Sequence, residues 1–187
     1  MTILQTERLC LRRLQNSDVT ALIDLWCDPN VTKHLGGPRD RAKLETIFEE
    51  DVKNPFAEHY DLWPVVEKQS NEVIGDCGLL EKEVDGKNEI EIIYILKTSA
   101  WGKGYATEIG QAIKEYAFEE LKLGRLIALI EPENEASERV ALKIGMSFEK
   151  EVIRSGGVKR KIYDSTEKRV GQNQSKIDPP QKGKSLI

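Results

Sequence analysis

A glycine-punctuated turn at residues 100–108 separates a strand-like apolar run from a helix-like one, and this junction constrains the fold more than any other part of the chain. In the preceding run, residues 90–96, most side chains are β-branched or aromatic, which is typical of a strand. Over residues 109–121, apolar side chains recur at three- and four-residue spacing, which predicts an amphipathic helix. Gly102 and Gly104 leave backbone N–H groups accessible beside the positive end of the helix dipole. The junction therefore predicts an anion-binding turn, with a diphosphate as the expected ligand.

Three kinds of phosphate-binding loop share this layout, and the spacing of the turn separates them. A Walker-type loop ends in Gly-Lys-Ser/Thr, whereas Lys103 is followed by a second glycine, so that class is excluded. A dinucleotide-binding fingerprint is matched in part, because Gly102 and Gly104 are present but Thr107 replaces the third glycine. Glu131 ends the next apolar run, where a ribose-binding acid is expected. A nucleotide-binding oxidoreductase therefore stays open as an alternative.

The third pattern is Arg/Gln-x-x-Gly-x-Gly/Ala, the acetyl-CoA-binding loop of the GNAT superfamily of N-acetyltransferases, and residues 101–106 resemble it except at the first position. The segment 131–146 resembles the second signature of this family, with Asn134, a serine three residues later and a Lys-x-Gly ending. Farther upstream, residues 62–67 and 73–79 resemble the central hairpin of the family, with its Ile-Gly-x-x-Gly-Leu ending. The chain is thus similar to this family in three separate places.

The first strand resembles a narrower branch. Residues 6–12 are similar to the start of the acetyltransferases that modify the N-terminal alanine or serine of ribosomal proteins, and the whole resemblance covers about residues 6–164. It implies an α/β fold of the α+β kind, with a mixed, mostly antiparallel twisted sheet, helices on both faces and a parallel strand pair that splays apart at the cofactor cleft. We expect residues 1–170 to form the acetyltransferase domain. Residues 171–187 are rich in Gly, Gln, Asn, Ser, Lys and Pro without periodicity, so we expect a flexible tail there.

The same resemblance implies that acetyl-CoA is the cofactor, that no metal is required, and that backbone groups of the glycine turn hold the diphosphate. The residues expected to contact acetyl-CoA are Trp101, Gly102, Lys103, Gly104, Tyr105, Ala106, Thr107 and Asn134. Asparagine is also among the best helix N-cap residues, so Asn134 fits a structural role equally well. An amine that attacks a thioester then needs a base and a stabilised leaving thiolate.

Two carboxylates are candidates for the base. Glu91 resembles the glutamate that precedes a tyrosine by three residues on the cofactor-side strand of the family. Glu89 lies on the same face if alternation is regular, so the sequence does not separate the two, and a water relay also stays open. His34 and His59 have a suitable intrinsic pKa, but neither has a partner acid at a recognisable spacing. We therefore expect Glu91 to act as the base.

Ser137 is the candidate for the group that stabilises the thiolate. It resembles the hydroxyl that the ribosomal-protein branch places near the sulfur, where it would donate a hydrogen bond to the departing thiolate. Many other branches place a tyrosine general acid at the position that Ala141 occupies, so a tyrosine acid is excluded there. A non-catalytic domain that binds acyl-CoA and senses it is a further alternative, supported by the missing tyrosine and the unassigned base.

The acceptor is expected to be a primary amine, and a protein N-terminus is favoured over a polyamine or a small-molecule amine. An α-amine titrates near about 8 and a lysine side chain near about 10.4, so the α-amine needs less help from a weak base. Acidic residues early in the chain would suit a basic peptide or a polyamine if they border the acceptor groove. These residues are Glu7, Glu49, Glu50 and Asp51.

Composition disfavours several other classes of partner. A net charge of -4 with 32% charged residues is ordinary for a soluble protein, and no broad basic face is evident, so no nucleic-acid partner is expected. No apolar run reaches the length of a membrane span and the first residues lack a signal-peptide pattern, so we expect a cytoplasmic protein without a membrane partner. Cys10, Cys27 and Cys77 are odd in number and far apart, so neither disulfides nor a zinc site are expected. A homodimer stays open.

Overall fold

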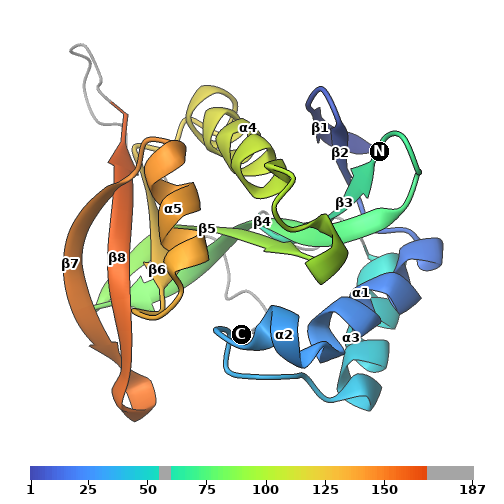
Figure 1. Ribbon diagram of the computed structural model, residues 1–187, viewed down its shortest axis with the longest axis horizontal. Coiled ribbons are helices and arrows are strands. Elements are labelled where there is room, and N and C mark those ends of the chain that lie inside the picture. Colours follow the sequence, from blue (N-terminus) through green and yellow to red (C-terminus); the bar gives the residue numbers. More distant parts are fainter. Residues whose placement is uncertain (55–59, 168–187) are drawn as a thin grey trace.

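The computed structural model describes residues 1–54 and 60–167, and the strands in this part of the chain form one eight-stranded sheet (Figure 1). The strand order is β1-β2-β3-β4-β5-β6-β8-β7, and every neighbouring pair is antiparallel except β5 and β6, which run parallel. The expected mixed, mostly antiparallel sheet of an α+β fold is therefore confirmed. The strands are β1 (Thr2–Gln5), β2 (Leu9–Arg12), β3 (Leu62–Glu67), β4 (Val73–Val84), β5 (Lys87–Leu96), β6 (Arg125–Ile130), β7 (Ser147–Arg154) and β8 (Val158–Thr166).

The helices cover both faces of the sheet, as expected. Helices α4 and α5 lie on one face, and α1, α2 and α3 lie on the other (Figure 1). We call these the α4 side and the α1 side of the sheet. The helices are α1 (Val19–Cys27), α2 (Pro29–Thr32), α3 (Arg41–Lys53), α4 (Tyr105–Glu119) and α5 (Glu135–Lys143), with short 3-10 turns at Asn16–Asp18, Thr98–Ala100 and Ser155–Gly157.

Helix α4 is fixed on the sheet by one apolar stripe. Ile109, Ile113 and Ala117 recur at four-residue spacing along it, and all three are fully buried in the core on the α4 side. Removing a large aliphatic side chain from water contributes on the order of 1.5–3 kcal/mol, so this stripe holds the helix firmly. The helix starts at Tyr105, directly after the glycine turn.

Helix α1 is anchored on the opposite face by a buried hydrogen bond. Trp26 is fully buried, and its indole Nε1 donates to the carboxylate of Asp76 on β4 at 2.9 Å. Asp76 is itself only 1% exposed, and burial raises its pKa to about 7. Leu22 of α1 and Phe48 of α3 pack into the same core. These contacts position the segment after α1, which borders the candidate site.

Strands β5 and β6 separate directly after their one registered pair in the described residues, which is Glu91 opposite Ile127. Beyond it, β5 continues to Leu96 paired with β4, and β6 continues to Ile130 paired with β8. The backbone groups on the two facing edges are therefore left without ladder partners. The expected splayed parallel pair is confirmed, and it opens toward the glycine turn.

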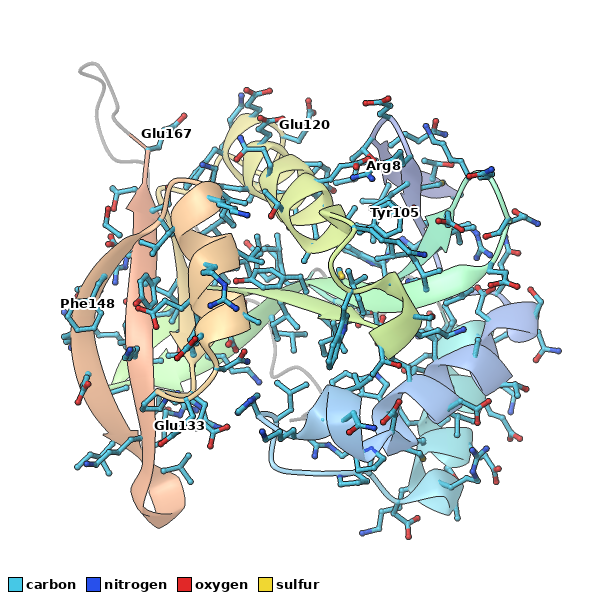
Figure 2. The ribbon with its side chains drawn as sticks, in the orientation of Figure 1. Arg8, Tyr105, Glu120, Glu133, Phe148 and Glu167 are labelled. Atoms are coloured by element: carbon cyan, nitrogen blue, oxygen red, sulfur yellow. The ribbon has the colours of Figure 1, made fainter. Side chains whose placement is uncertain are left out.

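The start of the chain differs from the expectation of one strand over residues 6–12. Strands β1 and β2 form an antiparallel hairpin, and Thr6, Glu7 and Arg8 make its turn. The backbone N–H of Arg8 donates to the carboxylate of Glu108 on α4 at 2.9 Å, and the hydroxyl of Thr6 donates to the same carboxylate at 2.5 Å. The expected strand is present at Leu9–Arg12, and the prediction missed only the turn before it, whose contact with Glu108 is made 100 positions away in the sequence. As a result Arg8 lies beside Tyr105, at the start of α4 (Figure 2).

The expected tail at 171–187 and the side chain of His59 lie outside the described residues. Within residues 1–54 and 60–167, no helix has the length and the apolar character that crossing a membrane would require.

Candidate active site

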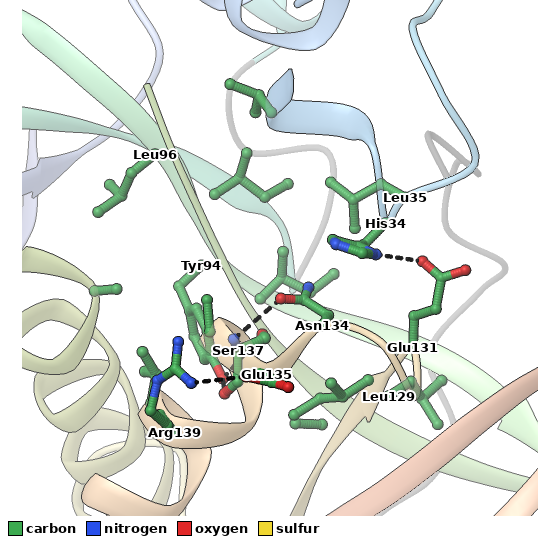
Figure 3. Close-up of a pocket in the computed structure, with 18 of the residues that line it drawn as sticks. His34, Leu35, Tyr94, Leu96, Leu129, Glu131, Asn134, Glu135, Ser137 and Arg139 are labelled. Carbon is green, nitrogen blue, oxygen red and sulfur yellow. Dashed lines mark hydrogen bonds and ion pairs between the residues drawn. The ribbon is translucent and has the colours of Figure 1, made fainter. Parts of the chain in front are cut away.

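A cavity of about 970 Å³ lies where β5 and β6 separate, and Figure 3 shows part of its wall. Its lining residues include the glycine turn and α5 on the α4 side and the segment after α2 on the α1 side. Alternation along β5 explains this: Tyr94 packs with the core of the α4 side, whereas Ile93 and Ile95 pack with α1 and α3. The cavity therefore extends through the gap in the sheet and is lined by residues from both faces.

The glycine turn presents the N-terminus of α4 to this cavity. Gly102 and Gly104 have φ angles of 75° and 81°, in the left-handed region that glycine adopts without strain. Gly104 is the N-cap of α4, and it supplies no side chain to cap the first turn. A helix N-terminus with uncapped N–H groups and the positive end of the dipole is a suitable site for a phosphate. The residues present therefore fit the diphosphate of acetyl-CoA.

Seven of the eight residues expected to contact acetyl-CoA line the cavity: Trp101, Gly102, Gly104, Tyr105, Ala106, Thr107 and Asn134. The exception is Lys103, which is exposed at the tip of the turn and is not part of the cavity wall. Its ammonium group lies 5.9 Å from the ring centroid of Tyr105. A contact between Lys103 and the cofactor stays a prediction.

Arg8 braces the glycine turn from the N-terminal hairpin. Its guanidinium donates to the backbone carbonyl of Lys103 at 2.9 Å, pairs with Glu108 at 2.6 Å and lies 4.4 Å from the ring centroid of Tyr105. The hydroxyl of Tyr105 in turn donates to Glu67 at 2.5 Å. Nothing in the sequence singles out Arg8, because its partners on the turn and on α4 are 95 and 100 positions away. These contacts hold the turn in shape from outside the cavity.

Glu91 lies in the cavity wall where the gap begins. Its side chain is 8% exposed, and its carboxylate accepts a hydrogen bond from the backbone N–H of Leu129 at 3.3 Å. Burial raises the pKa of Glu91 to about 7, opposed by nearby positive charges and by the Leu129 N–H. Glu89 is not in the wall, because its carboxylate pairs with Arg125 at 3.1 Å. The geometry thus separates the two carboxylates that alternation left equivalent.

Ser137 and Asn134 meet at the start of α5, as Figure 3 shows. The side-chain oxygen of Asn134 accepts a hydrogen bond from the backbone N–H of Ser137 at 3.1 Å, so the N-cap role is present. The hydroxyl of Ser137 donates to the hydroxyl of Tyr94 at 3.4 Å, and Tyr94 donates to the Ser137 carbonyl at 3.0 Å. Burial raises the pKa of Tyr94 to about 12, so this phenol stays protonated. Ala141 is fully buried and is not in the cavity wall.

His34 has a partner acid, contrary to the expectation from the sequence. Its ring Nδ1 lies 2.7 Å from the carboxylate of Glu131, and both residues line the cavity (Figure 3). The pair joins the segment after α2 to the end of β6. Spacing gave no sign of it because the two residues are 97 positions apart. Glu131, the acid expected to bind a ribose in the dinucleotide alternative, is therefore already engaged by a side chain.

The charges on the cavity wall differ from the acidic acceptor groove considered for the early segments. Glu7, Glu49, Glu50 and Asp51 are all absent from the wall, whereas Lys33, Lys82, Arg154 and Arg160 are part of it. Among the described residues, no group of histidine, cysteine, aspartate and glutamate side chains is arranged to hold a metal ion.

Comparison with known proteins places the chain in a family. A family model described as an acetyltransferase (GNAT) domain matches residues 8–147. The protein YkkB of Bacillus subtilis (strain 168) is 34% identical over 152 residues, which cover 81% of this chain and 88% of YkkB. The uncharacterized N-acetyltransferase p20 of Bacillus licheniformis is 35% identical over 161 residues, which cover 81% of this chain and 84% of p20.

Solved structures agree with this match. An acetyltransferase from Agrobacterium tumefaciens str. C58 has a TM-score of 0.74 and 29% identity, and the match covers 89% of this chain and 95% of that protein. The spermidine N-acetyltransferase of Vibrio cholerae in complex with CoA and spermine has a TM-score of 0.68 and 18% identity, covering 85% of this chain and 95% of that one. The structure of RimL, a ribosomal L7/L12 alpha-N-protein acetyltransferase in complex with coenzyme A, has a TM-score of 0.71 and 16% identity. The match covers 89% of this chain and 98% of RimL. At such low identities the last two show the fold alone.

The comparisons and the fold agree with each other. The matched family model spans the glycine turn, the splayed strands and the start of α5, which line much of the cavity. A dinucleotide-binding domain would instead surround its glycine turn with a parallel, doubly wound sheet, and here only β5 and β6 are parallel among the described strands. The oxidoreductase alternative therefore has no support, and the expected acyltransferase class is confirmed. By its sequence match and its fold, the chain belongs to the GNAT family of acetyltransferases.

Proposed function

We propose that this chain transfers the acetyl group of acetyl-CoA directly to a primary amine, and that a protein N-terminal α-amine is the favoured acceptor. The observation that carries the proposal is the place of Glu91, a buried carboxylate in the cavity wall where the gap in the sheet begins. Glu91 lies two and four residues before Ile93 and Ile95, which pack on the α1 side, so alternation places it on that side, whereas the glycine turn lies on the α4 side. An amine and a thioester can therefore meet in the gap from opposite faces of the sheet.

The residues that would hold acetyl-CoA follow from the geometry of the α4 side. The uncapped N-terminus of α4 would bind the diphosphate through backbone N–H groups. The facing edges of β5 and β6 carry backbone groups without ladder partners, and these would pair with the amides of the pantetheine arm. The same edges offer N–H groups that can donate to the thioester carbonyl as negative charge develops on its oxygen.

Direct transfer is favoured because no cysteine is placed to take the acetyl group first. Cys10, Cys27 and Cys77 are free thiols, and none of them lies in the cavity wall. A covalent route through a thiol would need a thiolate beside the thioester carbonyl. In direct transfer the amine nitrogen forms the new bond to the carbonyl carbon, the carbon–sulfur bond breaks, and the proton of the amine goes to Glu91.

The pKa values of the two kinds of amine bear on which acceptor suits Glu91 as a base. At about 7, the pKa of Glu91 is closer to the pKa of an α-amine than to that of a lysine side chain. Moving a proton to it costs about 1.4 kcal/mol from an α-amine with a pKa of about 8, and about 4.6 kcal/mol from a lysine side chain with a pKa of about 10.4. The difference corresponds to roughly a 200-fold advantage for the α-amine. This supports a protein N-terminus over an internal lysine.

Ser137 is proposed to stabilise the leaving thiolate. Its hydroxyl lies in the cavity wall at the start of α5, next to the hydroxyl of Tyr94 at 3.4 Å. A hydroxyl there can turn from Tyr94 to the sulfur and donate a hydrogen bond to it as charge develops. Tyr94 then keeps its own hydrogen bond to the Ser137 carbonyl, which holds the start of α5 against β5.

The test is acetyl transfer to a peptide with a free N-terminus, beside its N-blocked copy that carries a lysine. We expect the free N-terminus to react roughly 200-fold faster at neutral pH, for the proton-transfer reason above. Faster reaction of the blocked peptide would remove the α-amine preference but leave the acetyltransferase. Binding of acetyl-CoA with no transfer to either peptide would favour the acyl-CoA sensor instead.

A further inference from the structure

The acceptor would approach Glu91 on the α1 side of the sheet, and the charges there determine which acceptors fit. Glu91 lies on the same face of β5 as Ile93 and Ile95, because side chains two residues apart in a strand share a face. Ile93 and Ile95 pack against α1 and α3. The glycine turn and Ser137 belong to the opposite side, together with α4 and α5. The parts of the acceptor beyond its amine would therefore contact the wall of the cavity on the α1 side.

Three cations from three different strands line the cavity on this side: Lys82 of β4, Arg154 of β7 and Arg160 of β8. The register of β4 places the lysine. Leu80 stands opposite Glu91 and packs with the core of the α1 side, and Lys82 follows two residues later on the same face. Lys82 and the carboxylate of Glu91 therefore project from the same face of neighbouring strands.

The register of β7 and β8 places both arginines on that face as well. Val152 stands opposite Arg160 and packs with Ile127. Ile127 is the residue of β6 that pairs with Glu91, where the gap begins. Residues opposite each other in a ladder share a face, and so do residues two apart in a strand, which adds Arg154. The positive charges of all three cations oppose the rise in the pKa of Glu91, so they act on its carboxylate.

These three cations form no ion pair within the described residues, although cations elsewhere on the same two strands do. Arg154 and Arg160 each donate to a backbone carbonyl at 2.9 Å. Lys150 on β7 and Lys161 on β8 instead pair with carboxylates at 2.7 Å and 3.0 Å. Lys150 and Lys161 thus have carboxylate partners of their own, whereas Lys82, Arg154 and Arg160 share the nearby charge of Glu91.

Partial burial makes the positive charge of Lys82 unfavourable. Burial lowers the pKa of Lys82, and the like charge of Arg154 lowers it further, while Glu91 opposes the effect. The other acids of the cavity wall lie together at 131–135, and two of them are already paired, with His34 and with Arg139. Glu133 is the third acid of that group, and on the α1 side the three cations outnumber Glu91, so a carboxylate of the acceptor would add to the charge balance there.

We propose that the acceptor carries a carboxylate close to its amine, and that Lys82, Arg154 and Arg160 bind this carboxylate while Glu91 receives the amine proton. The proposal rests on the proposed function, because it describes the same acceptor site. The ligand chemistry is that of an amino acid, or of a peptide whose first side chains after the N-terminus are acidic. A polyamine carries only positive charge along its length, so the same three cations repel it.

The test measures acetyl transfer from acetyl-CoA to three peptides that differ only in their second and third residues. The sequences are Ala-Glu-Glu-Gly-Gly, Ala-Gln-Gln-Gly-Gly and Ala-Lys-Lys-Gly-Gly, with free glutamate and spermidine beside them. A charge-assisted hydrogen bond changes affinity by about 10- to 100-fold, so kcat/KM for the acidic peptide should exceed that for the neutral peptide by at least about 10-fold. The basic peptide and spermidine should be the poorest acceptors. A faster reaction of free glutamate than of the acidic peptide identifies an amino acid as the source of the carboxylate, and the reverse identifies a peptide.

Variants assign the effect to the cations. Arg154→Gln and Arg160→Gln should each remove most of the preference for the acidic peptide through the KM of the acceptor, with the KM of acetyl-CoA unchanged. Arg160→Glu should shift the preference toward the basic peptide. Lys150→Gln is the matched control, because Lys150 lies on β7 outside the cavity and pairs with Asp85. It should keep the preference of the wild type.

Calorimetry measures the affinity of the protein for the acetylated peptides, which does not depend on turnover. The carboxylate site is supported if the acidic product binds more tightly than the neutral product and if Arg160→Gln removes this difference. This holds even if acetyl transfer fails, and then only the proposed function is wrong. Equal or weaker binding of the acidic product, or equal turnover of all three peptides, overturns the inference while leaving the acetyltransferase in place. A rise in the KM of acetyl-CoA in the arginine variants also overturns it, because the cations would then bind the cofactor.

Discussion

The carboxylate of Glu91 accepts a hydrogen bond from the backbone N–H of Leu129 at 3.3 Å, across the gap between β5 and β6. The two strands pair at one position in the described residues and then separate, so this contact lies where the gap begins. A carboxylate held by the opposite strand is limited in the directions it can point. It is therefore oriented before either substrate arrives, which is what a general base requires.

The role proposed for Ser137 predicts a loss of rate without a loss of cofactor binding. Ser137→Ala removes the hydroxyl that would donate to the departing thiolate, and a hydrogen bond to a charged group is worth on the order of 1.5–3 kcal/mol. We expect kcat to fall by about 10- to 100-fold while the KM of acetyl-CoA stays close to that of the wild type. Steady-state kinetics of thiol release measure both values. An unchanged kcat would rule out this role.

Asn134 has two candidate roles, and two substitutions separate them. Its side chain caps α5 by accepting from the Ser137 N–H at 3.1 Å, so Asn134→Ala should lower stability by about 1 kcal/mol. Asn134→Asp keeps the cap and should keep the stability, because aspartate caps as well as asparagine. If the amide also contacts acetyl-CoA, both variants should raise the dissociation constant of acetyl-CoA. Only the aspartate variant should do so without a change in melting temperature. Equal cofactor affinity in this variant and the wild type would leave Asn134 with the structural role only.

The elements that carry this site were largely predictable from local pattern. Local signals predicted β5, the turn and α4, because these signals depend on neighbouring residues. They are the apolar run at 90–96, the helical spacing after it and the glycines between them. Asn134 before a helix gave the cap of α5 for the same reason. The splayed strand pair came from the family resemblance, since strand pairing over long distances leaves no periodic signal.

The glycine turn predicts a second experiment with a matched control. Gly104 and Gly86 have φ angles of 81° and 74°, so alanine at either position is strained by about 1–2 kcal/mol. Gly104→Ala should also raise the dissociation constant of acetyl-CoA, because relief of this backbone strain would move the N–H groups at the start of α4, while the added carbon itself makes only an ordinary contact, 3.5 Å from the Arg8 guanidinium. Gly86→Ala, in the turn between β4 and β5, should lose similar stability and bind acetyl-CoA normally. Calorimetry and thermal melting decide, and a cofactor affinity that falls equally in both would mean that strain alone is responsible.

Asp76 predicts a pH-dependent effect on stability. Burial raises its pKa from 3.8 to about 7 in the folded protein, so the folded state binds the proton more tightly than the unfolded state does. The free energy of unfolding should therefore fall as the pH rises from about 4 to 7. Asp76→Asn removes this ionisation and leaves an oxygen that can still accept from Trp26.

The measurement is urea unfolding of wild type and Asp76→Asn at pH 5 and pH 8. We expect the variant to gain stability relative to the wild type on going from pH 5 to pH 8, by on the order of 3 kcal/mol. If the difference in the free energy of unfolding between the two proteins is the same at pH 5 and pH 8, the pKa of Asp76 is that of an ordinary exposed aspartate, and this account of Asp76 is wrong.

The contacts that complete the site were not predictable, and each failure has a physical cause. Glu89 and Glu91 are equivalent under a period of two, and they are separated only by Arg125, which comes from β6. His34 and Glu131 meet only because α2 and the end of β6 border the same cavity. In both cases the deciding partner comes from a distant segment, and local spacing carries no information about it.

The most direct test of the central claim is the pH dependence of acetyl transfer in Glu91→Gln and Glu89→Gln, measured beside the wild type. The acceptor amine titrates equally in all three, so the ratio of wild-type to variant kcat/KM reports the base alone. For Glu91→Gln we expect this ratio to rise with pH through about 7 and to level off at about 100- to 10,000-fold, because the carboxylate accepts a proton only when ionised. For Glu89→Gln, which lies on the same face but outside the cavity, the ratio should stay near one at every pH. A ratio for Glu91→Gln that is small and independent of pH would contradict its assignment as the base.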